Sequence, residues 1–158
     1  MDELIYTHWF WLLYLGAFGA CVGSFINVVI YRMPRGLGLA RPASRCPSCG
    51  RRIRWFQNIP ILSWVALRGR CHYCRTRISA GYLGVELLTG GLYAGLYYAC
   101  FMTGLHEETF GAGTILVAWP YFVPQLVLVA ALLAATLIDA RYFIIPLAIP
   151  VFATVASW

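Results

Sequence analysis

Four cysteines in the first half of the chain have the residue type and the spacing of a metal site. Cys46 and Cys49 form one Cys-x2-Cys pair, Cys71 and Cys74 form a second, and 21 residues separate the two pairs. Two residues between thiolates let one tight turn present both sulfurs to a tetrahedral ion. Gly50 directly follows the first pair, where it allows the backbone to curl. The spacing therefore predicts a four-thiolate metal site.

The segment between the cysteine pairs needs a cross-link, because it has little apolar material for a core. It offers a short run at residues 59–62 and the side chains of Trp55, Phe56 and Trp64. The many arginines around this segment predict that it lies in the cytoplasm. The cytoplasm is reducing and disfavours structural disulfides, so we expect the cross-link to be a metal ion, with zinc preferred. Rubredoxin-like iron is the main alternative and free thiols are the next. Four protein ligands leave no open position, so the expected metal role is structural.

Two carboxylates, Glu86 and Asp139, stand at or inside apolar stretches. Ionisable groups in membrane-spanning segments are costly, so each is a functional candidate. The alternative to a functional role for Asp139 is an interfacial anchor paired with Arg141. The alternative for Glu86 is a structural place in the first helical turn, near water. Aspartyl proteolysis needs two neighbouring carboxyl groups with separated pKa values. The only other aspartate is Asp2, which we expect on the opposite side of the membrane.

The remaining reactive side chains have structural interpretations. We expect Cys21 and Cys100, inside predicted helices, to be small buried hydrophobic side chains. His72 lies between two cysteines, where crowding argues against a fifth ligand, and we expect it to be exposed. Small residues spaced for close helix contacts occur at Gly16 and Ala20, Gly19 and Gly23, and Gly91 and Gly95.

The composition indicates a membrane protein, with 61% hydrophobic residues, 11% charged residues and a mean hydropathy of +0.71. Three stretches have about the 20 apolar residues that span a bilayer, at 9–30, 82–102 and 115–138. A fourth, at 142–158, is marginal. The first is too long for the apolar core of a cleaved signal, so we expect a retained helix. The sequence predicts an all-α polytopic membrane protein with three to four transmembrane helices and a small zinc-ribbon-like cytoplasmic loop.

The charge distribution predicts the orientation in the membrane. All twelve basic residues are arginines, and eleven of them fall between Arg32 and Arg77. By the positive-inside rule the loop 32–79 is cytoplasmic, and the N-terminus and the loop 103–114 face outward. Topology explains these arginines, so we expect no nucleic-acid partner. The expected division is residues 1–31 for the first helix, 32–80 for the cysteine loop, and 81–158 for helices two, three and the start of four.

The motifs of the chain resemble the N-terminal part of bacterial type IV prepilin peptidases, which are bifunctional leader peptidases and N-methyltransferases. Six blocks occur in order along the sequence. They are Gly-Ser-Phe-Ile-Asn-Val-Val-Ile-Tyr-Arg at 23–32, Cys-Pro-Ser-Cys-Gly at 46–50, Asn-Ile-Pro-Ile-Leu-Ser-Trp at 58–64, Leu-Arg-Gly-Arg-Cys at 67–71, Val-Glu-Leu-Leu at 85–88 and Thr-Leu-Ile-Asp at 136–139 with Pro146 following.

The resemblance implies a bacterial inner-membrane enzyme with two activities. It would cut prepilin or pseudopilin leaders after a glycine at the cytoplasmic face, and methylate the new N-terminus with S-adenosylmethionine. Asp139 matches the first catalytic aspartate of the family, and Gly69 matches a position used for methyl transfer. Cys46, Cys49, Cys71 and Cys74 match its cytoplasmic metal motif. The implied partners are pilin precursors and the lipid bilayer.

The chain also departs from the family pattern. The second aspartate of the family lies in a Gly-x-Gly-Asp motif on a later helix, and these 158 residues hold no such motif. We therefore expect a fragment or a truncated product. The alternatives are a non-proteolytic membrane-anchored zinc module and a methyltransferase-only fragment for pilus or type II secretion assembly. Leu83 stands where the family usually has proline.

Overall fold

The part of the chain that the structure describes consists of helices joined by turns and loops. The computed structural model describes residues 2–39, 44–103 and 115–143, with residues 149, 151, 154 and 155. These ranges contain helices and two isolated β-bridges but no β-strand, which confirms the all-α prediction for them. The marginal fourth stretch at 142–158 and the loop at 103–114 lie largely outside the described residues.

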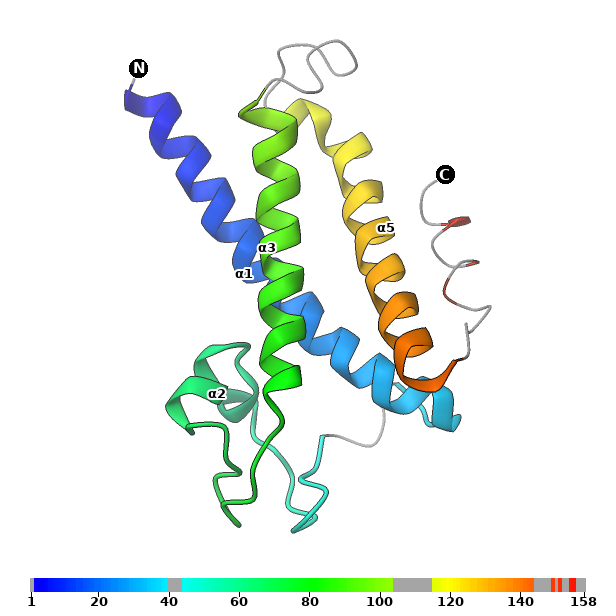
Figure 1. Ribbon diagram of the computed structural model, residues 1–158. Coiled ribbons are helices and arrows are strands. Elements are labelled where there is room, and N and C mark those ends of the chain that lie inside the picture. Colours follow the sequence, from blue (N-terminus) through cyan, green and yellow to red (C-terminus); the bar gives the residue numbers. More distant parts are fainter. Residues whose placement is uncertain are drawn as a thin grey trace.

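Three long helices form the body of the molecule (Figure 1). They are α1 (Asp2–Arg32), α3 (Ala80–Phe101) and α5 (Ile115–Tyr142). Two helical segments, Tyr6–Arg35 and Val117–Tyr142, are long and apolar enough to cross a membrane. The 22 residues of α3 extend about 33 Å, enough for a bilayer core, but its glycines, tyrosines and Glu86 lower its hydropathy.

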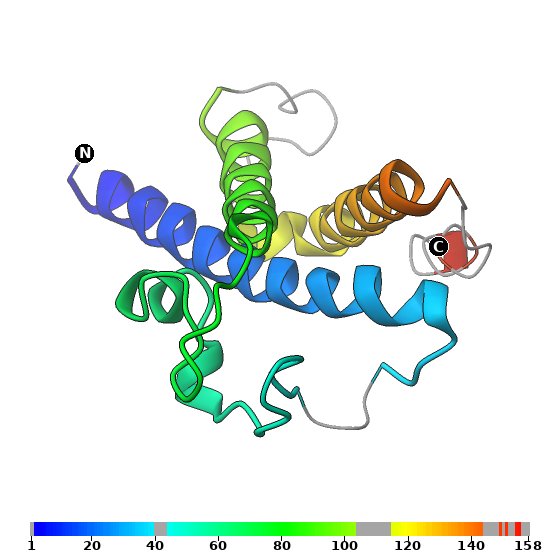
Figure 2. The same ribbon diagram turned by 60° about the horizontal axis from the view of Figure 1, so that its bottom comes forward.

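Short elements between α1 and α3 form the cysteine loop. A 3₁₀ turn, η1 (Met33–Arg35), ends α1, and Gly36 stops it at a φ of 65°. Farther along lie η2 (Trp55–Asn58) and the single-turn helix α2 (Leu62–Ala66). Figure 2 shows the loop running from the end of α1 back to the start of α3, with α2 near the crossing of these two helices. The loop therefore lies at one end of the helices.

Glycines bring α1 and α3 into close contact. A Cβ at Gly23 would lie 2.8 Å from the Cα of Glu86, and a Cβ at Gly19 would lie 2.8 Å from the Thr89 carbonyl oxygen. Gly90 of α3 is equally close to the backbone of α1. Such distances leave no room for a side chain, so the crossing depends on glycine at these positions. The prediction of close approach is confirmed for Gly19 and Gly23.

The apolar core divides into two clusters along the helices. One joins the first half of α1, the second half of α3 and the first half of α5. The other joins the end of α1, the start of α3 and the end of α5. The first contains Leu15, Tyr93, Tyr97, Cys100, Ile115, Phe122 and Leu126. The second contains Ile26, Val29, Ile30, Val85, Ala134, Ile138 and Ile149. Dispersion and burial in these clusters hold α5 against the α1 and α3 pair.

Polar contacts fix three helix ends at one end of the molecule. Asn27 of α1 donates from Nδ2 to the Tyr82 carbonyl at the start of α3, over 3.0 Å. Arg35 donates to the Tyr142 hydroxyl at the end of α5, over 2.8 Å. The start of α3 and the end of α5 therefore lie on the side of the molecule where α1 ends and the cysteine loop begins (Figure 1).

One prediction about helix faces is wrong, one is confirmed and one stays a prediction. Cys100 is buried, as expected, but Cys21 is exposed on α1. A Cβ added at Gly91 or Gly95 would meet nothing within 4 Å, so these glycines make no close helix contact among the described residues. A stretch that is apolar on all sides gives no signal of which face packs, and this explains the error at Cys21.

The α1–α3 crossing predicts a large effect at one glycine and a small one at another. Gly23→Ala places a methyl group against the backbone of α3, and we expect it to lower the free energy of unfolding by about 1–3 kcal/mol. Gly91→Ala on α3 faces open space and serves as the matched control. Unfolding of both variants in mixed detergent micelles measures the difference, and equal stabilities would contradict the proposed crossing.

Candidate metal centre and catalytic residues

The first cysteine pair lies on a tight turn closed by backbone hydrogen bonds. The Gly50 N–H donates to the Cys46 carbonyl over 2.8 Å, and the Cys46 N–H donates to the Arg51 carbonyl over 3.0 Å. Gly50 has a φ of 67°, which glycine adopts without strain. An isolated bridge between Arg45 and Arg52 closes the base of the turn.

The second cysteine pair repeats this geometry. The Arg75 N–H donates to the Cys71 carbonyl over 3.1 Å, and the Cys71 N–H donates to the Thr76 carbonyl over 2.9 Å. Arg75 takes the place of Gly50, with a φ of 59°, and Arg70 and Arg77 form the bridge. The chain thus builds the same turn twice, a local repeat that the sequence analysis did not identify. A repeated Arg-Cys-x2-Cys pattern was the available signal.

The two turns bring their sulfurs together. The Sγ atoms of Cys46, Cys49, Cys71 and Cys74 all lie within 4.8 Å of one another, and 3.7 Å separates those of Cys46 and Cys74. In a tetrahedral zinc site with Zn–S bonds of about 2.3 Å, the sulfurs stand about 3.8 Å apart. The spacing of the four sulfurs therefore fits one tetrahedral ion.

Hydrogen-bond donors around the sulfurs favour the thiolate form at two positions. The backbone N–H groups of Cys49 and Ser48 hold the pKa of Cys46 below its usual value, against the effect of burial. The Thr76 hydroxyl and backbone N–H lower the pKa of Cys74 to about 6. Thiolates are the form that binds metal, so these donors prepare the site for a cation.

Crowding of the sulfurs has the opposite effect at Cys49. The Arg51 backbone N–H favours its thiolate, but desolvation and the nearby sulfurs of Cys46 and Cys74 outweigh it and raise the pKa to about 11. Four thiols this close do not all ionise unless a positive charge stands among them. A bound divalent cation supplies that charge.

Side chains around the metal turns are placed as expected or support the turns. His72 is exposed, which confirms the sequence prediction, and its ring stands edge-on to Tyr73. The Arg51 guanidinium of the first turn lies 5.0 Å from the centre of the Tyr73 ring in the second. This cation–π contact links the two turns beyond the sulfurs.

Glu86 joins the cysteine loop to α3. Its Oε2 accepts a hydrogen bond from the Ile61 N–H over 2.8 Å, and the side chain is buried. Ile61 has a φ of 61°, which costs a β-branched residue about 1–3 kcal/mol. A hydrogen bond to a carboxylate contributes roughly 1.5–3 kcal/mol and offsets this strain. The expectation that Glu86 lies near water is therefore wrong, because the loop folds over it.

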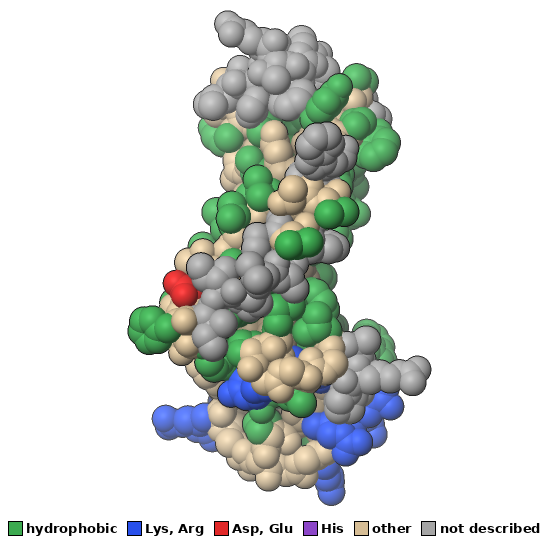
Figure 3. Space-filling model, turned by 90° about the vertical axis from the view of Figure 1, so that its right-hand side faces the viewer, with side chains coloured by type: hydrophobic (Ala, Val, Ile, Leu, Met, Phe, Trp, Pro, Cys, Tyr) green, Lys and Arg blue, Asp and Glu red, His purple; other side chains and the backbone are tan. Residues whose placement is uncertain are grey.

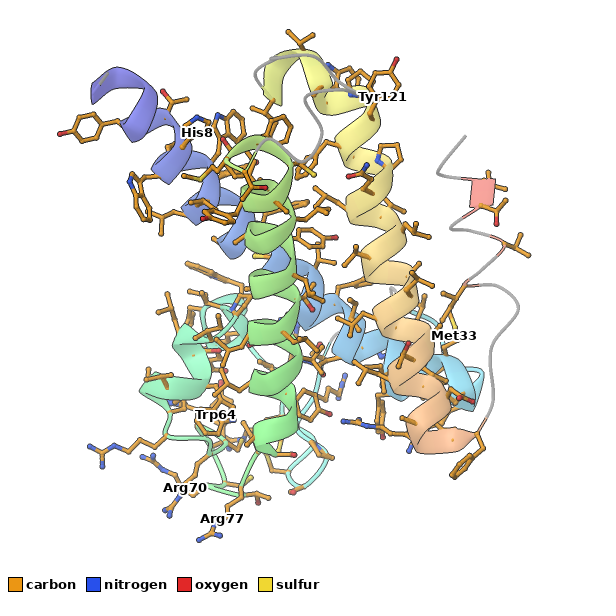
Figure 4. The ribbon with its side chains drawn as sticks, turned by 45° about the horizontal axis from the view of Figure 1, so that its top comes forward. His8, Met33, Trp64, Arg70, Arg77 and Tyr121 are labelled. Atoms are coloured by element: carbon orange, nitrogen blue, oxygen red, sulfur yellow. The ribbon has the colours of Figure 1, made fainter. Side chains whose placement is uncertain are left out.

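Gly69 lies under an indole ring. Its φ is 63°, and a Cβ there would come within 2.7 Å of Trp64 Cζ2. Its N–H donates to the Trp64 carbonyl over 2.9 Å, and its carbonyl accepts from the Ile78 N–H over 2.7 Å. In Figure 4 Trp64 lies on the side of the loop nearer α3, and Arg70 and Arg77 extend away from the helices. Both the backbone conformation and the ring require glycine at this position.

Two buried donors near this turn have no hydrogen-bond partner among the described residues. They are the indole Nε1 of Trp64 and the amide Nε2 of Gln57. Buried polar groups are nearly always paired, so these two N–H donors are exceptions among the described residues. Trp64 Nε1 is bonded to Cε2, which lies 3.0 Å from a Cβ built on Gly69. The unpaired indole N–H is therefore close to Gly69.

Asp139 is exposed in the last turns of α5, at the same end of the molecule as the cysteine loop. Its backbone carbonyl accepts from the Phe143 N–H over 2.8 Å where the helix ends. Nearby, a guanidinium nitrogen of Arg141 lies 3.6 Å from a Cβ built on Gly81, at the start of α3. The described residues thus carry Asp139, Gly69 and the four cysteines on one end, although on separate elements.

A family model matches residues 17–100 of the chain, which is more than half of its length. The matching model is described as the bacterial peptidase A24 N-terminal domain. The matched residues include the second half of α1, the whole cysteine loop and nearly all of α3. Asp139 lies beyond them.

Curated relatives extend the similarity over most of the chain. A prepilin leader peptidase/N-methyltransferase of Myxococcus xanthus is 45% identical over 140 residues, covering 88% of this chain and 37% of the relative. Proteins of the same name from Dichelobacter nodosus and Burkholderia pseudomallei are 34% and 36% identical, covering 85% and 81% of this chain and 51% and 44% of the relatives. The chain thus spans about half the length of these relatives or less. No solved structure matches it significantly.

The sulfur geometry predicts which cysteine substitutions lose metal. We expect Cys49→Ser to reduce bound zinc at least about tenfold, because one of four ligands is lost. Cys21→Ser, an exposed position on α1, is the matched control and should retain one zinc per chain. Elemental analysis of the purified proteins measures the ratio. Unchanged zinc in Cys49→Ser would rule out the four-sulfur site.

Proposed function

The chain belongs to the family of the bacterial peptidase A24 N-terminal domain, and we propose that it is the N-terminal part of a prepilin leader peptidase and N-methyltransferase. In this proposal the protein cleaves type IV prepilin or pseudopilin leaders and methylates the new N-terminus. The support is the order of motifs, the names of the relatives and the gathering of Asp139, Gly69 and the cysteine loop at one end of the helices.

We propose that this end faces the cytoplasm in a bacterial inner membrane. The three long helices then cross the bilayer, with the N-terminus outward. The helical stretches Tyr6–Arg35 and Val117–Tyr142 are apolar enough to do so, and α3 packs against both of them through the core clusters. Eleven of twelve arginines lie in the loop at the proposed cytoplasmic end, as the positive-inside rule requires.

Zinc is the proposed ion at the four cysteines. Their sulfur spacing fits a tetrahedral ion, and an all-thiolate set suits zinc. With four protein ligands, the metal would hold the two turns together and take no part in bond breaking. The loop would then be a rigid platform beside the end of α5 that carries Asp139.

Asp139 is the proposed first aspartate of the peptidase. A carboxylate at the cytoplasmic end of a transmembrane helix can reach a scissile bond where a substrate helix leaves the membrane. The reaction requires two carboxyl groups, so Asp139 needs a partner. One group of the pair activates water and the other protonates the carbonyl. We propose that a later helix of the full-length protein provides it, because these 158 residues lack the family's Gly-x-Gly-Asp.

The peptidase proposal predicts the effect of a one-atom change. In full-length protein that contains this chain, Asp139→Asn should reduce leader cleavage at least a hundredfold, because an amide cannot act as acid or base (a factor on the order of 10²–10⁴ for general acid–base groups). The matched control is Asp2→Asn, because Asp2 lies at the start of α1, away from the end of the molecule that carries Asp139. Cleavage of a prepilin in membrane preparations gives the rates. Wild-type cleavage by Asp139→Asn would remove this residue from the mechanism.

Methyl transfer is proposed to use the turn at Gly69. The unpaired Trp64 indole N–H beside Gly69 fits an acceptor group such as the carboxylate or ribose of S-adenosylmethionine. The cofactor supplies the methyl group when it is bound. Within this chain, the Trp64 indole N–H would orient the cofactor by a hydrogen bond. Gly69 would leave the indole ring in place, since any side chain there would displace it.

Binding of S-adenosylmethionine to the zinc-loaded chain tests this second activity. We expect Trp64→Phe, which keeps a ring but removes the N–H, to weaken binding roughly tenfold, the usual effect of one hydrogen bond to a charged group. Gly69→Ala should abolish binding, and Gly84→Ala, with open space around it, should leave it unchanged. Isothermal titration calorimetry measures the affinities. Absence of binding by the unmodified chain would instead favour a zinc module without methyltransferase activity.

A further inference from the structure

We propose that the segment from η2 to α2, residues 55–66, lies in the headgroup region of an anionic bilayer and anchors the metal loop to the membrane surface. This inference rests on the membrane placement proposed above. It goes beyond a cytoplasmic position for the loop, because it assigns a lipid-contacting surface to a specific part of it. We call this part the apolar segment.

The apolar segment exposes large hydrophobic side chains. Trp55 is 82% exposed, Leu62 67% and Val65 58%. Leu62 and Val65 are three residues apart in α2 and therefore share one helix face. Phe56 and Ile59 are also exposed, and Phe56 stands edge-on to Trp55. A small metal loop in water has no reason to present this much apolar surface.

The position of the apolar segment along α3 places it at membrane depth. Glu86, which accepts from Ile61, is the seventh residue of α3, so it lies about 9 Å along the helix from its start. Amphipathic segments at a bilayer surface sit roughly 5–10 Å into the boundary between headgroups and acyl chains. Figure 1 shows α2 beside this lower part of α3, with the cysteine turns farther from the helices.

The charge around the apolar segment fits anionic lipid. The loop from Arg32 to Ser79 contains no acidic residue. Exposed arginines flank the segment on both sides, at Arg45, Arg51, Arg52, Arg54, Arg68, Arg70, Arg75 and Arg77. In Figure 3 basic side chains gather at the end of the molecule below the hydrophobic shaft of the helices. The Trp, Leu and Val side chains thus lie at the level of the helix ends, and the arginines lie beneath them. This arrangement is typical of an interfacial membrane contact.

Fluorine NMR of the chain labelled with 5-fluorotryptophan tests this placement. The chain is reconstituted with zinc into nanodiscs of phosphatidylglycerol or of phosphatidylcholine, and Trp55→Phe assigns the Trp55 signal. Dissolved oxygen reports on contact with lipid, and a water-soluble nickel chelate reports on contact with water. Leu132→Trp, at a position 58% exposed near the middle of α5, reports membrane insertion, and His72→Trp supplies a signal from an exposed position on a metal turn.

We expect the nickel chelate to broaden Trp55 at least threefold less than the His72→Trp signal, and oxygen to broaden it strongly. The protection should be greater in phosphatidylglycerol than in phosphatidylcholine, and equal protection would overturn the role of anionic lipid. Protection of Trp55 from both agents would indicate a covering protein surface and also overturn the proposal.

The outcome separates this inference from the membrane placement. If nickel reaches Trp55 as readily as the His72→Trp signal and the Leu132→Trp signal remains in lipid, the apolar segment is not interfacial but the helices still span the membrane. If nickel reaches the Leu132→Trp signal, the membrane placement itself fails, and the inference fails with it.

Discussion

The mutual repulsion of four sulfur ligands is the constraint on which the cysteine loop depends. Their Sγ atoms lie within 4.8 Å of one another, and backbone donors favour the thiolate at Cys46 and Cys74. A cluster of this kind is stable only when a cation neutralises it. The loop has too little apolar material of its own to form a core, so a bound metal ion would take the place of one. Removal of the cation would leave the sulfurs without the attraction that holds the two turns together.

A buried carboxylate joins the middle of the cysteine loop to α3. Glu86 accepts from Ile61 on the strained part of the loop, and the neighbouring backbone of Glu86 packs against Gly23 of α1. One turn of α3 therefore contacts both the metal loop and the first helix. This arrangement gives the proposed platform a fixed height relative to the end of α5 and Asp139. It also brings the exposed apolar side chains of residues 55–66 level with the helix ends.

Sequence patterns predicted the parts of this fold that depend on local spacing. The two cysteine pairs, the apolar stretches that became α1, α3 and α5, and the exposure of His72 follow from residue type and spacing alone. The roles of Asp139 and Gly69 stay predictions. The burial of Glu86 could not be predicted, because its partner is a backbone N–H that a positive φ at Ile61 turns toward α3. The exposure of Cys21 was missed because apolar helices carry no amphipathic signal.

X-ray absorption at the zinc edge of the purified chain tests the central claim most directly, because it reports the type and number of atoms bound to the metal. The account predicts four sulfur neighbours at about 2.3 Å and no nitrogen or oxygen neighbour. A first shell that contains nitrogen or oxygen, or fewer than four sulfurs, would contradict a loop organised around Cys46, Cys49, Cys71 and Cys74.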